Sequence, residues 1–156
     1  MTIRVGIEIN RSFDVESDFD SVFTLLADVP ESTRYFPKLE RLEPIGDNAY
    51  RWEMEKIGID KHSLQAVYAC RYHDDRDAGE ITWTPVEGEG NGIVSGKWKV
   101  KKGQGGRTHL EFRTEAEMTL PLPGLLKLAL SPVVKHEFNS LVDQYIQNLQ
   151  NHFSKS

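Results

Sequence analysis

The residues best able to recognise a ligand in this chain are tyrosines and tryptophans that alternate with charged residues. The segment Tyr50-Arg-Trp-Glu-Met-Glu55 shows the pattern, because successive side chains of a β-strand point to opposite faces of a sheet. Buried tyrosine hydroxyls need partners, so Tyr50, Tyr68 and Tyr72 would bond one another, water or a ligand oxygen. Such rings suit a flat, partly oxygenated molecule; alternatively, they fill a solid core.

The expected ligand site comprises residues on the inward face of the sheet and on the C-terminal helix. These residues are Tyr50, Trp52, Met54, Tyr68, Tyr72, Trp83, Trp98, Phe112, Thr114, Phe138 and Tyr145. Because the set contains no acid or base, apolar contact must supply most of the binding energy and hydroxyl groups the selectivity. Arg11 has the parity of Ile9 and is either a polar inward residue or a strand-end residue that reaches water.

The five histidines show no metal-ligand spacing. They are His62, His73, His109, His136 and His152, and they lie far apart in the sequence. The pair His136-Glu137 begins like a zinc-protease motif, but Ser140 stands where the second histidine should be. We therefore expect no bound metal and no other cofactor.

Motifs for nucleophilic catalysis or phosphate binding are also weak. Ser95, within Gly92–Gly96, has the wrong spacing for a nucleophile elbow and precedes more strand rather than a helix. Cys70 has no neighbouring base in the sequence, so we expect a small buried thiol. The glycine-rich segments 88–92 and 103–106 precede strands, whereas a phosphate cradle needs a helix N-terminus. No catalytic residue is predicted from these motifs.

The N-terminal part of the chain predicts one strand and two short helices. Apolar and polar residues alternate from Ile3 to about Phe13, which indicates the first strand. Ser17 is the expected N-cap of a helix that Pro30 ends, and Glu31–Tyr35 would form a second helix.

Six further strands are expected, separated by five turns. The turns are predicted at Gly46–Asn48, Gly58–Lys61, Asp74–Gly79, Glu87–Gly92 and Gly103–Gly106. The weakest of the six strands contains Leu39 and Leu42, and one strand is expected to run from Leu64 to Tyr72. With the first strand, the chain would form a seven-stranded antiparallel sheet.

A long amphipathic helix is predicted at the C-terminal end. Val134, Phe138, Leu141, Tyr145, Leu149 and Phe153 recur every three or four residues. Ser131 and Pro132 fit its N-cap and first helical position, so we expect a break there from a short preceding helix.

The run from Leu120 to Leu130 is the most apolar segment of the chain, with Lys127 as its one charge. It could be an inert cover of the sheet, a mobile gate or a lip that touches a membrane. Leu122, Leu125 and Leu128 would form the gate.

Composition narrows the function classes. A chain of 156 residues fits one domain, 1–156, and its net charge of -5 disfavours binding to nucleic acid. No segment has the apolar length of a signal peptide core or a membrane span, and Cys70 is the one cysteine. We expect a cytoplasmic location, and the sequence leaves the oligomeric state open.

The order of elements resembles the START-like, or SRPBCC, helix-grip superfamily, over nearly the whole chain. The residues that carry the resemblance are Ser12-Phe-Asp-Val15, Tyr35-Phe-Pro-Lys-Leu39, Gly96-Lys-Trp98, Arg107-Thr-His-Leu110 and the long terminal helix. The resemblance implies an α+β fold in which a curved antiparallel sheet wraps around the last helix and leaves an apolar cavity.

Three functions follow from these expectations. The first is binding of a hydrophobic or aromatic small molecule, such as a lipid, a quinone or a polyketide-like compound, in that cavity. The second, implied by the polyketide cyclase/dehydrase members of the superfamily, is a cyclase or dehydratase that uses cavity tyrosines. The third is an interaction module for a membrane or a protein partner, with peripheral membrane contact through the apolar run.

Overall fold

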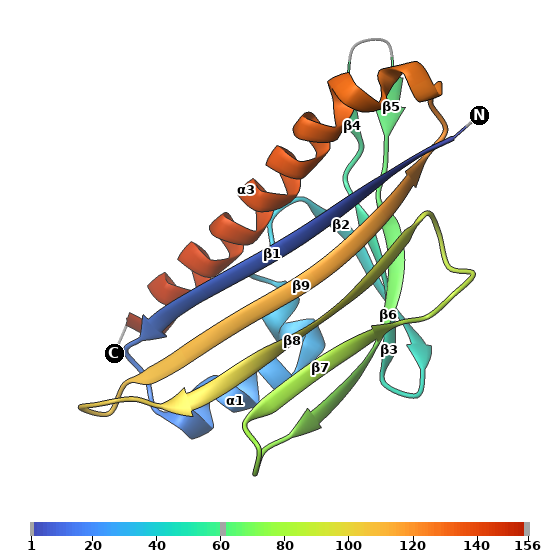
Figure 1. Cartoon of the computed structure of the whole chain (residues 1–156). Coiled ribbons are helices and arrows are strands. Elements are labelled where there is room, and N and C mark those ends of the chain that lie inside the picture. The colour runs from blue at the N-terminus through green and yellow to red at the C-terminus, as the bar shows by residue number, and fades with distance from the viewer. Residues whose placement is uncertain (1, 60–61, 155–156) are drawn as a thin grey trace.

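A curved antiparallel sheet of seven strands dominates the computed structural model, which describes residues 2–59 and 62–154 (Figure 1). The strands are β1 (Ile3–Val15), β2 (Leu39–Gly46), β3 (Ala49–Met54), β6 (Val67–Asp75), β7 (Glu80–Pro85), β8 (Gly92–Lys102) and β9 (Thr108–Leu120). Their spatial order is β1-β9-β8-β7-β6-β3-β2, and each neighbouring pair is antiparallel. The predicted seven-stranded sheet is confirmed.

The register of strand β9 with β1 and β8 fixes which side chains of these three strands face inward. It pairs with β1 along the 13 residues of both strands and with β8 along the 11 residues of β8, without a register shift. A slip of one residue would turn every side chain to the opposite face. Leu110 and Phe112 are therefore buried, whereas Arg113 and Glu115 are exposed.

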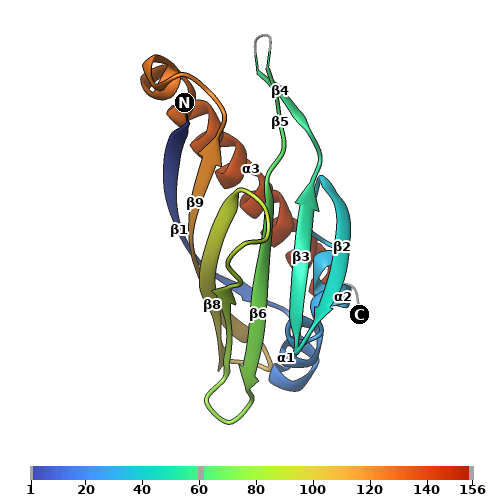
Figure 2. The ribbon, with the colours of Figure 1, turned by 90° about the vertical axis from the view of Figure 1, so that its right-hand side faces the viewer.

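Helix α3 (Lys127–Ser154) crosses the concave side of the sheet, between the edge formed by β1 and the edge formed by β2 (Figure 2). Its buried residues include Val134, Leu141, Tyr145 and Leu149, which lie on one stripe of the helix. The sheet thus wraps around the last helix, and the predicted helix-grip architecture is confirmed.

Helices α1 (Phe19–Ala27) and α2 (Val29–Thr33) lie beneath one end of the sheet (Figures 1 and 2). The cap of α1 is Asp18 rather than Ser17: its carboxylate accepts from the Ser21 N–H at 3.3 Å, a bond that lowers the pKa of Asp18. Pro30 does not end α1. It lies in the first turn of α2, which Asp28 caps, because proline at that position loses no helical hydrogen bond.

The predicted helix break at Pro132 is wrong. Helix α3 begins at Lys127, directly after a 3-10 turn, η1 (Gly124–Leu126), and continues through Pro132. Leu130 and Val134 are both buried on the inner side, so packing against the sheet supports the helix on either side of the proline. Ser131 is consequently not a cap, and its hydroxyl has no partner among the described residues.

A small second sheet divides one of the predicted strands. Strands β4 (Ile57–Ile59) and β5 (His62–Leu64) form a hairpin that projects beyond the main sheet (Figure 2). The strand expected from Leu64 to Tyr72 is therefore split, and β6 starts at Val67. The turn expected at Gly58–Lys61 includes residues 60 and 61, which lie outside the described residues.

Gly96 provides a test of how tightly the inner face is packed. A Cβ atom at Gly96 would lie 2.5 Å from Cζ2 and 2.7 Å from Cε2 of Trp83, and closer still to the Arg113 carbonyl oxygen. We expect Gly96→Ala to lower the free energy of unfolding by about 1–3 kcal/mol, measured by urea denaturation, because strand and indole must move.

Gly6→Ala in β1 is the control, since nothing lies within 4 Å of a Cβ atom at that position. It should change the free energy of unfolding by no more than about 0.5 kcal/mol. Equal effects of the two substitutions would contradict the close packing of Trp83 on Gly96.

Candidate functional site

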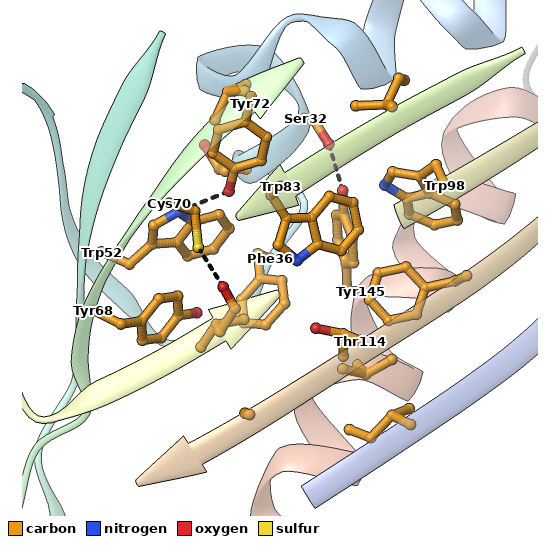
Figure 3. A pocket seen from close by; sticks show the side chains of 18 of the residues that line it. Ser32, Phe36, Trp52, Tyr68, Cys70, Tyr72, Trp83, Trp98, Thr114 and Tyr145 are labelled. Carbon is orange, nitrogen blue, oxygen red and sulfur yellow. Dashed lines mark hydrogen bonds between the residues drawn. The ribbon is translucent and has the colours of Figure 1, made fainter. Parts of the chain in front are cut away.

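The candidate site is a cavity enclosed by the concave face of the sheet, α2 and α3 (Figure 3). Nine of the residues expected from the sequence line it: Trp52, Tyr68, Tyr72, Trp83, Trp98, Phe112, Thr114, Phe138 and Tyr145. Further lining residues come from β1, β6, β7, β8, β9, the helices and the loop after α2: Ile7, Ile9, Leu26, Val29, Ser32, Thr33, Phe36, Cys70, Ile81, Val94, Ala116 and Val142. The structure brings most of the predicted set together around one space.

The cavity is small. The space open to the centres of water-sized molecules is about 80 Å³, within a larger atom-free region of about 790 Å³ that includes space continuous with solvent. A free volume of about 80 Å³ lies below the range for ligand pockets, about 300–1,000 Å³, so a ring-sized ligand requires some displacement of wall side chains.

Aromatic rings contact one another around much of the wall. Trp52 stacks on Tyr68 with ring centroids 5.6 Å apart, and Phe36 meets Trp52 edge-on at 5.4 Å. On the other side, the centroid of Phe112 is 4.7 Å from that of Trp98 and 5.7 Å from that of Trp83. These contacts hold the rings in fixed orientations, so the wall is largely preformed.

Several polar groups of the wall are paired with protein atoms (Figure 3). The hydroxyls of Ser32 and Tyr145 are hydrogen-bonded to each other. The indole of Trp52 donates to the Tyr72 hydroxyl at 3.0 Å, and Thr114 donates to a main-chain carbonyl at 2.9 Å. These bonds lower the cost of burying polar atoms in an apolar wall.

Burial raises the pKa values of the ionisable groups in the wall. Desolvation raises the pKa of Tyr68 and of Tyr72 well above the usual range of a phenol. It also raises the pKa of Tyr145 and that of the Cys70 thiol, each to about 12. At neutral pH all four groups therefore stay protonated, so they are available as hydrogen-bond donors and not as proton acceptors.

No aspartate, glutamate, lysine, arginine or histidine of the described chain lines the cavity. The charged residues of β8 and β9 lie on the outer face instead, where Lys101 pairs with Glu111 at 2.6 Å and Arg113 with Glu115 at 2.9 Å. The cavity consequently offers hydrogen bonds but no countercharge.

Tyr50, Met54 and Arg11 do not line the cavity. Tyr50 is partly exposed beside Tyr72, with ring centroids 6.0 Å apart, and Met54 is buried in the core beyond the hollow. Arg11 turns to α3: its guanidinium pairs with Asp143 at 2.7 Å and donates to Asn139 at 2.8 Å. Arg11 therefore has the inward parity expected from Ile9 but reaches α3 rather than the cavity, because β1 is an edge strand whose end lies beside the helix.

The three leucines of the suggested gate lie in different environments. Leu122 is buried at 1% exposure, whereas Leu125 and Leu128 are 95% and 90% exposed. None of them lines the cavity. No helix in the described ranges is both long and apolar enough to cross a membrane.

A hydrogen-bonded Ser-His-Asp array, which sequence reasoning missed, lies on the outer face of β1 and β9. His109 Nε2 is 3.1 Å from the Ser12 hydroxyl, and Nδ1 is 2.7 Å from Asp14. The array could have been found in the sequence only by pairing Asp14 with His109 across two strands that lie far apart in the chain. No local pattern reveals that pairing. Ser12 and Asp14 are exposed to water on the face opposite the cavity, so we interpret the array as a link that holds edge strand β1 to β9.

The sequence matches a known family over most of its length. The model of the polyketide cyclase / dehydrase and lipid transport family matches residues 15–141. The chain belongs to this family. No match was found among curated proteins.

Solved structures share the fold. A conserved protein of Geobacillus kaustophilus is 16% identical, with 99% of this chain and 97% of that chain covered and a TM-score of 0.67. A START superfamily protein of Mycobacterium smegmatis is 14% identical, with coverage of 95% and 97% and a TM-score of 0.66. The Zhui aromatase/cyclase of Streptomyces sp. R1128 is 18% identical, with coverage of 94% and 90% and a TM-score of 0.61. At these identities the likeness shows the fold alone.

The tyrosine hydroxyls of the wall should differ in their contribution to stability. Tyr145→Phe leaves the Ser32 hydroxyl without its partner, and we expect a loss of about 1–2 kcal/mol in the free energy of unfolding. The Tyr68 hydroxyl forms no hydrogen bond with the other lining residues drawn in Figure 3, so Tyr68→Phe should be neutral or slightly stabilising. Urea denaturation of both variants measures the difference, and a Tyr68→Phe loss as large as that of Tyr145→Phe would contradict this assignment.

Proposed function

We propose that this protein binds a neutral, largely apolar small molecule of the lipid, quinone or polyketide-like class between its curved sheet and α3. The observation that supports this function is the charge-free cavity walled by Trp52, Trp83, Trp98 and Phe112. Membership of a family described by polyketide chemistry and lipid transport agrees with such a ligand.

The free energy of apolar burial, less the cost of association, favours moderate affinity for the ligand. Burial of about 400 Å² of apolar ligand surface contributes on the order of 10 kcal/mol before the cost of association is subtracted. The remainder corresponds to binding in the micromolar range. A ring-sized ligand requires some displacement of wall residues, because the free space is about 80 Å³ for water-sized molecules.

Binding without turnover is favoured over cyclase or dehydratase chemistry. Proton abstraction needs a base within hydrogen-bond reach of the substrate. The groups that could serve are Tyr68, Tyr72, Tyr145 and Cys70, and burial raises the pKa of each. They remain protonated near neutrality, which suits hydrogen-bond donation to a bound molecule.

Filling the cavity should abolish binding. Ala116 lines the cavity from β9, and Ala116→Phe would place a ring in the hollow. We expect the affinity for the neutral fluorescent probe N-phenyl-1-naphthylamine to fall by about tenfold or more, because the variant removes apolar contact area. A fluorescence titration measures the change.

Thr119→Phe is the matched control, since Thr119 lies on the same strand with the opposite parity. It should bind the probe as the wild type does. Equal binding by Ala116→Phe and wild type, or no binding by the wild type, would overturn the proposed function.

Contact with a membrane surface is a second candidate, which the exposure of Leu125 and Leu128 favours. Insertion of each leucine into lipid would contribute about 1.5–3 kcal/mol. We expect wild-type protein to co-sediment with phosphatidylcholine vesicles and the double variant Leu125→Ser/Leu128→Ser to stay in solution. Ile93→Ser, which removes an exposed apolar residue of β8, is the control; sedimentation unaffected by the leucine changes would exclude this candidate.

A further inference from the structure

Four hydrogen-bond donors of the cavity wall have no acceptor among the other lining residues drawn in Figure 3. The indole N–H groups of Trp83 and Trp98 and the hydroxyl of Tyr68 form no hydrogen bond with those residues. The Tyr72 hydroxyl accepts from Trp52, so its own proton also remains free to donate. An indole N–H donates a hydrogen bond and never accepts one, so the two indoles can bond only an acceptor atom of a ligand.

These donors point into the cavity. Figure 3 shows the hydroxyl of Tyr68 and the ring nitrogen of Trp98 directed toward the middle of the lining residues. The indole of Trp83 lies against Gly96, where no Cβ would fit, and Trp98 is held by Phe112 at 4.7 Å between centroids. The donors are therefore held in place before a ligand arrives.

The cavity wall has few groups that could accept a proton from a ligand or neutralise the charge of a ligand. The hydroxyl of Thr114 and the thiol of Cys70 donate to main-chain carbonyls, which satisfies those carbonyls. Ser32 and Tyr145 are bonded to each other. A ligand carboxylate would be buried with no countercharge, which costs far more than hydrogen bonds to neutral groups return.

We infer that the ligand is a neutral molecule with at least one acceptor oxygen, such as a ketone or quinone carbonyl, which receives hydrogen bonds from Trp83, Trp98 or Tyr68. This inference rests on the proposed function and narrows its ligand class. It excludes fatty acids and other anions. It also ranks the affinity for a pure hydrocarbon below that for its ketone, because the hydrocarbon offers these donors no acceptor.

Three compounds with one ring skeleton test the inference on the wild-type protein. They are 9-fluorenone, which carries a carbonyl oxygen, fluorene, which carries none, and fluorene-9-carboxylate, which is charged. We expect 9-fluorenone to bind roughly tenfold more tightly than fluorene, although fluorene is the more hydrophobic compound, and the carboxylate to bind most weakly. Isothermal titration calorimetry gives the three affinities.

Nuclear magnetic resonance of the indole N–H groups locates the contact, because the chain has 3 tryptophans. Trp83→Phe and Trp98→Phe assign the resonances. On addition of 9-fluorenone, the indole proton of Trp83 or Trp98 should move downfield, whereas that of Trp52, already bonded to Tyr72, should move less. If the Tyr68 hydroxyl is the donor instead of an indole, Tyr68→Phe should abolish the preference for 9-fluorenone over fluorene.

The outcomes separate this inference from the proposed function. Binding of fluorene as tight as that of 9-fluorenone, still lost in Ala116→Phe, would overturn the inference and leave the proposed function standing. Tightest binding of the carboxylate would also overturn it, as would a ketone preference that moves neither indole and survives Tyr68→Phe. Failure of all three compounds to bind would overturn both.

Discussion

The cavity depends on the uninterrupted register of β9 with its two neighbours. β9 pairs with β1 over its whole length and with all of β8, so the parity of three strands is set together. That parity directs Trp98, Phe112, Thr114 and Ala116 to α3 and leaves Lys101, Glu111 and Arg113 in water. A single-residue slip in β9 would exchange these sets and replace an apolar hollow by a charged one.

Exclusion of charge from the hollow determines what the site can do. Protonated hydroxyls and indole N–H groups orient a ligand, but they do not remove protons from it near neutral pH. The fold is shared with structures whose names refer to START proteins and to an aromatase/cyclase, so the fold by itself does not choose between carriage and catalysis. The proposal of neutral recognition therefore rests on the side chains inside the cavity and not on the fold.

Residue periodicity was sufficient to predict the sheet, the long helix and nine of the residues that line the cavity, but it did not decide which inward residues reach the hollow. Trp52 lines the cavity, whereas Tyr50 and Met54, of the same parity on β3, do not. That distinction depends on sheet curvature and on where α2 and α3 pack, which are long-range properties. Ser32 and Phe36 could not be assigned to the wall for the same reason. The prediction of a helix break at Pro132 was wrong because proline favours the first turn of a helix, and burial of Leu130 and Val134 overrode this local preference.

Crystals of the protein under xenon pressure would test the central claim most directly, because xenon enters dry apolar cavities without any need to know the natural ligand. The account predicts a xenon site among Trp83, Trp98, Phe112 and Tyr145, with the surrounding rings in the positions described above. Interlocked rings with no xenon among them, or a cluster of ordered waters held by charged side chains at that place, would contradict it.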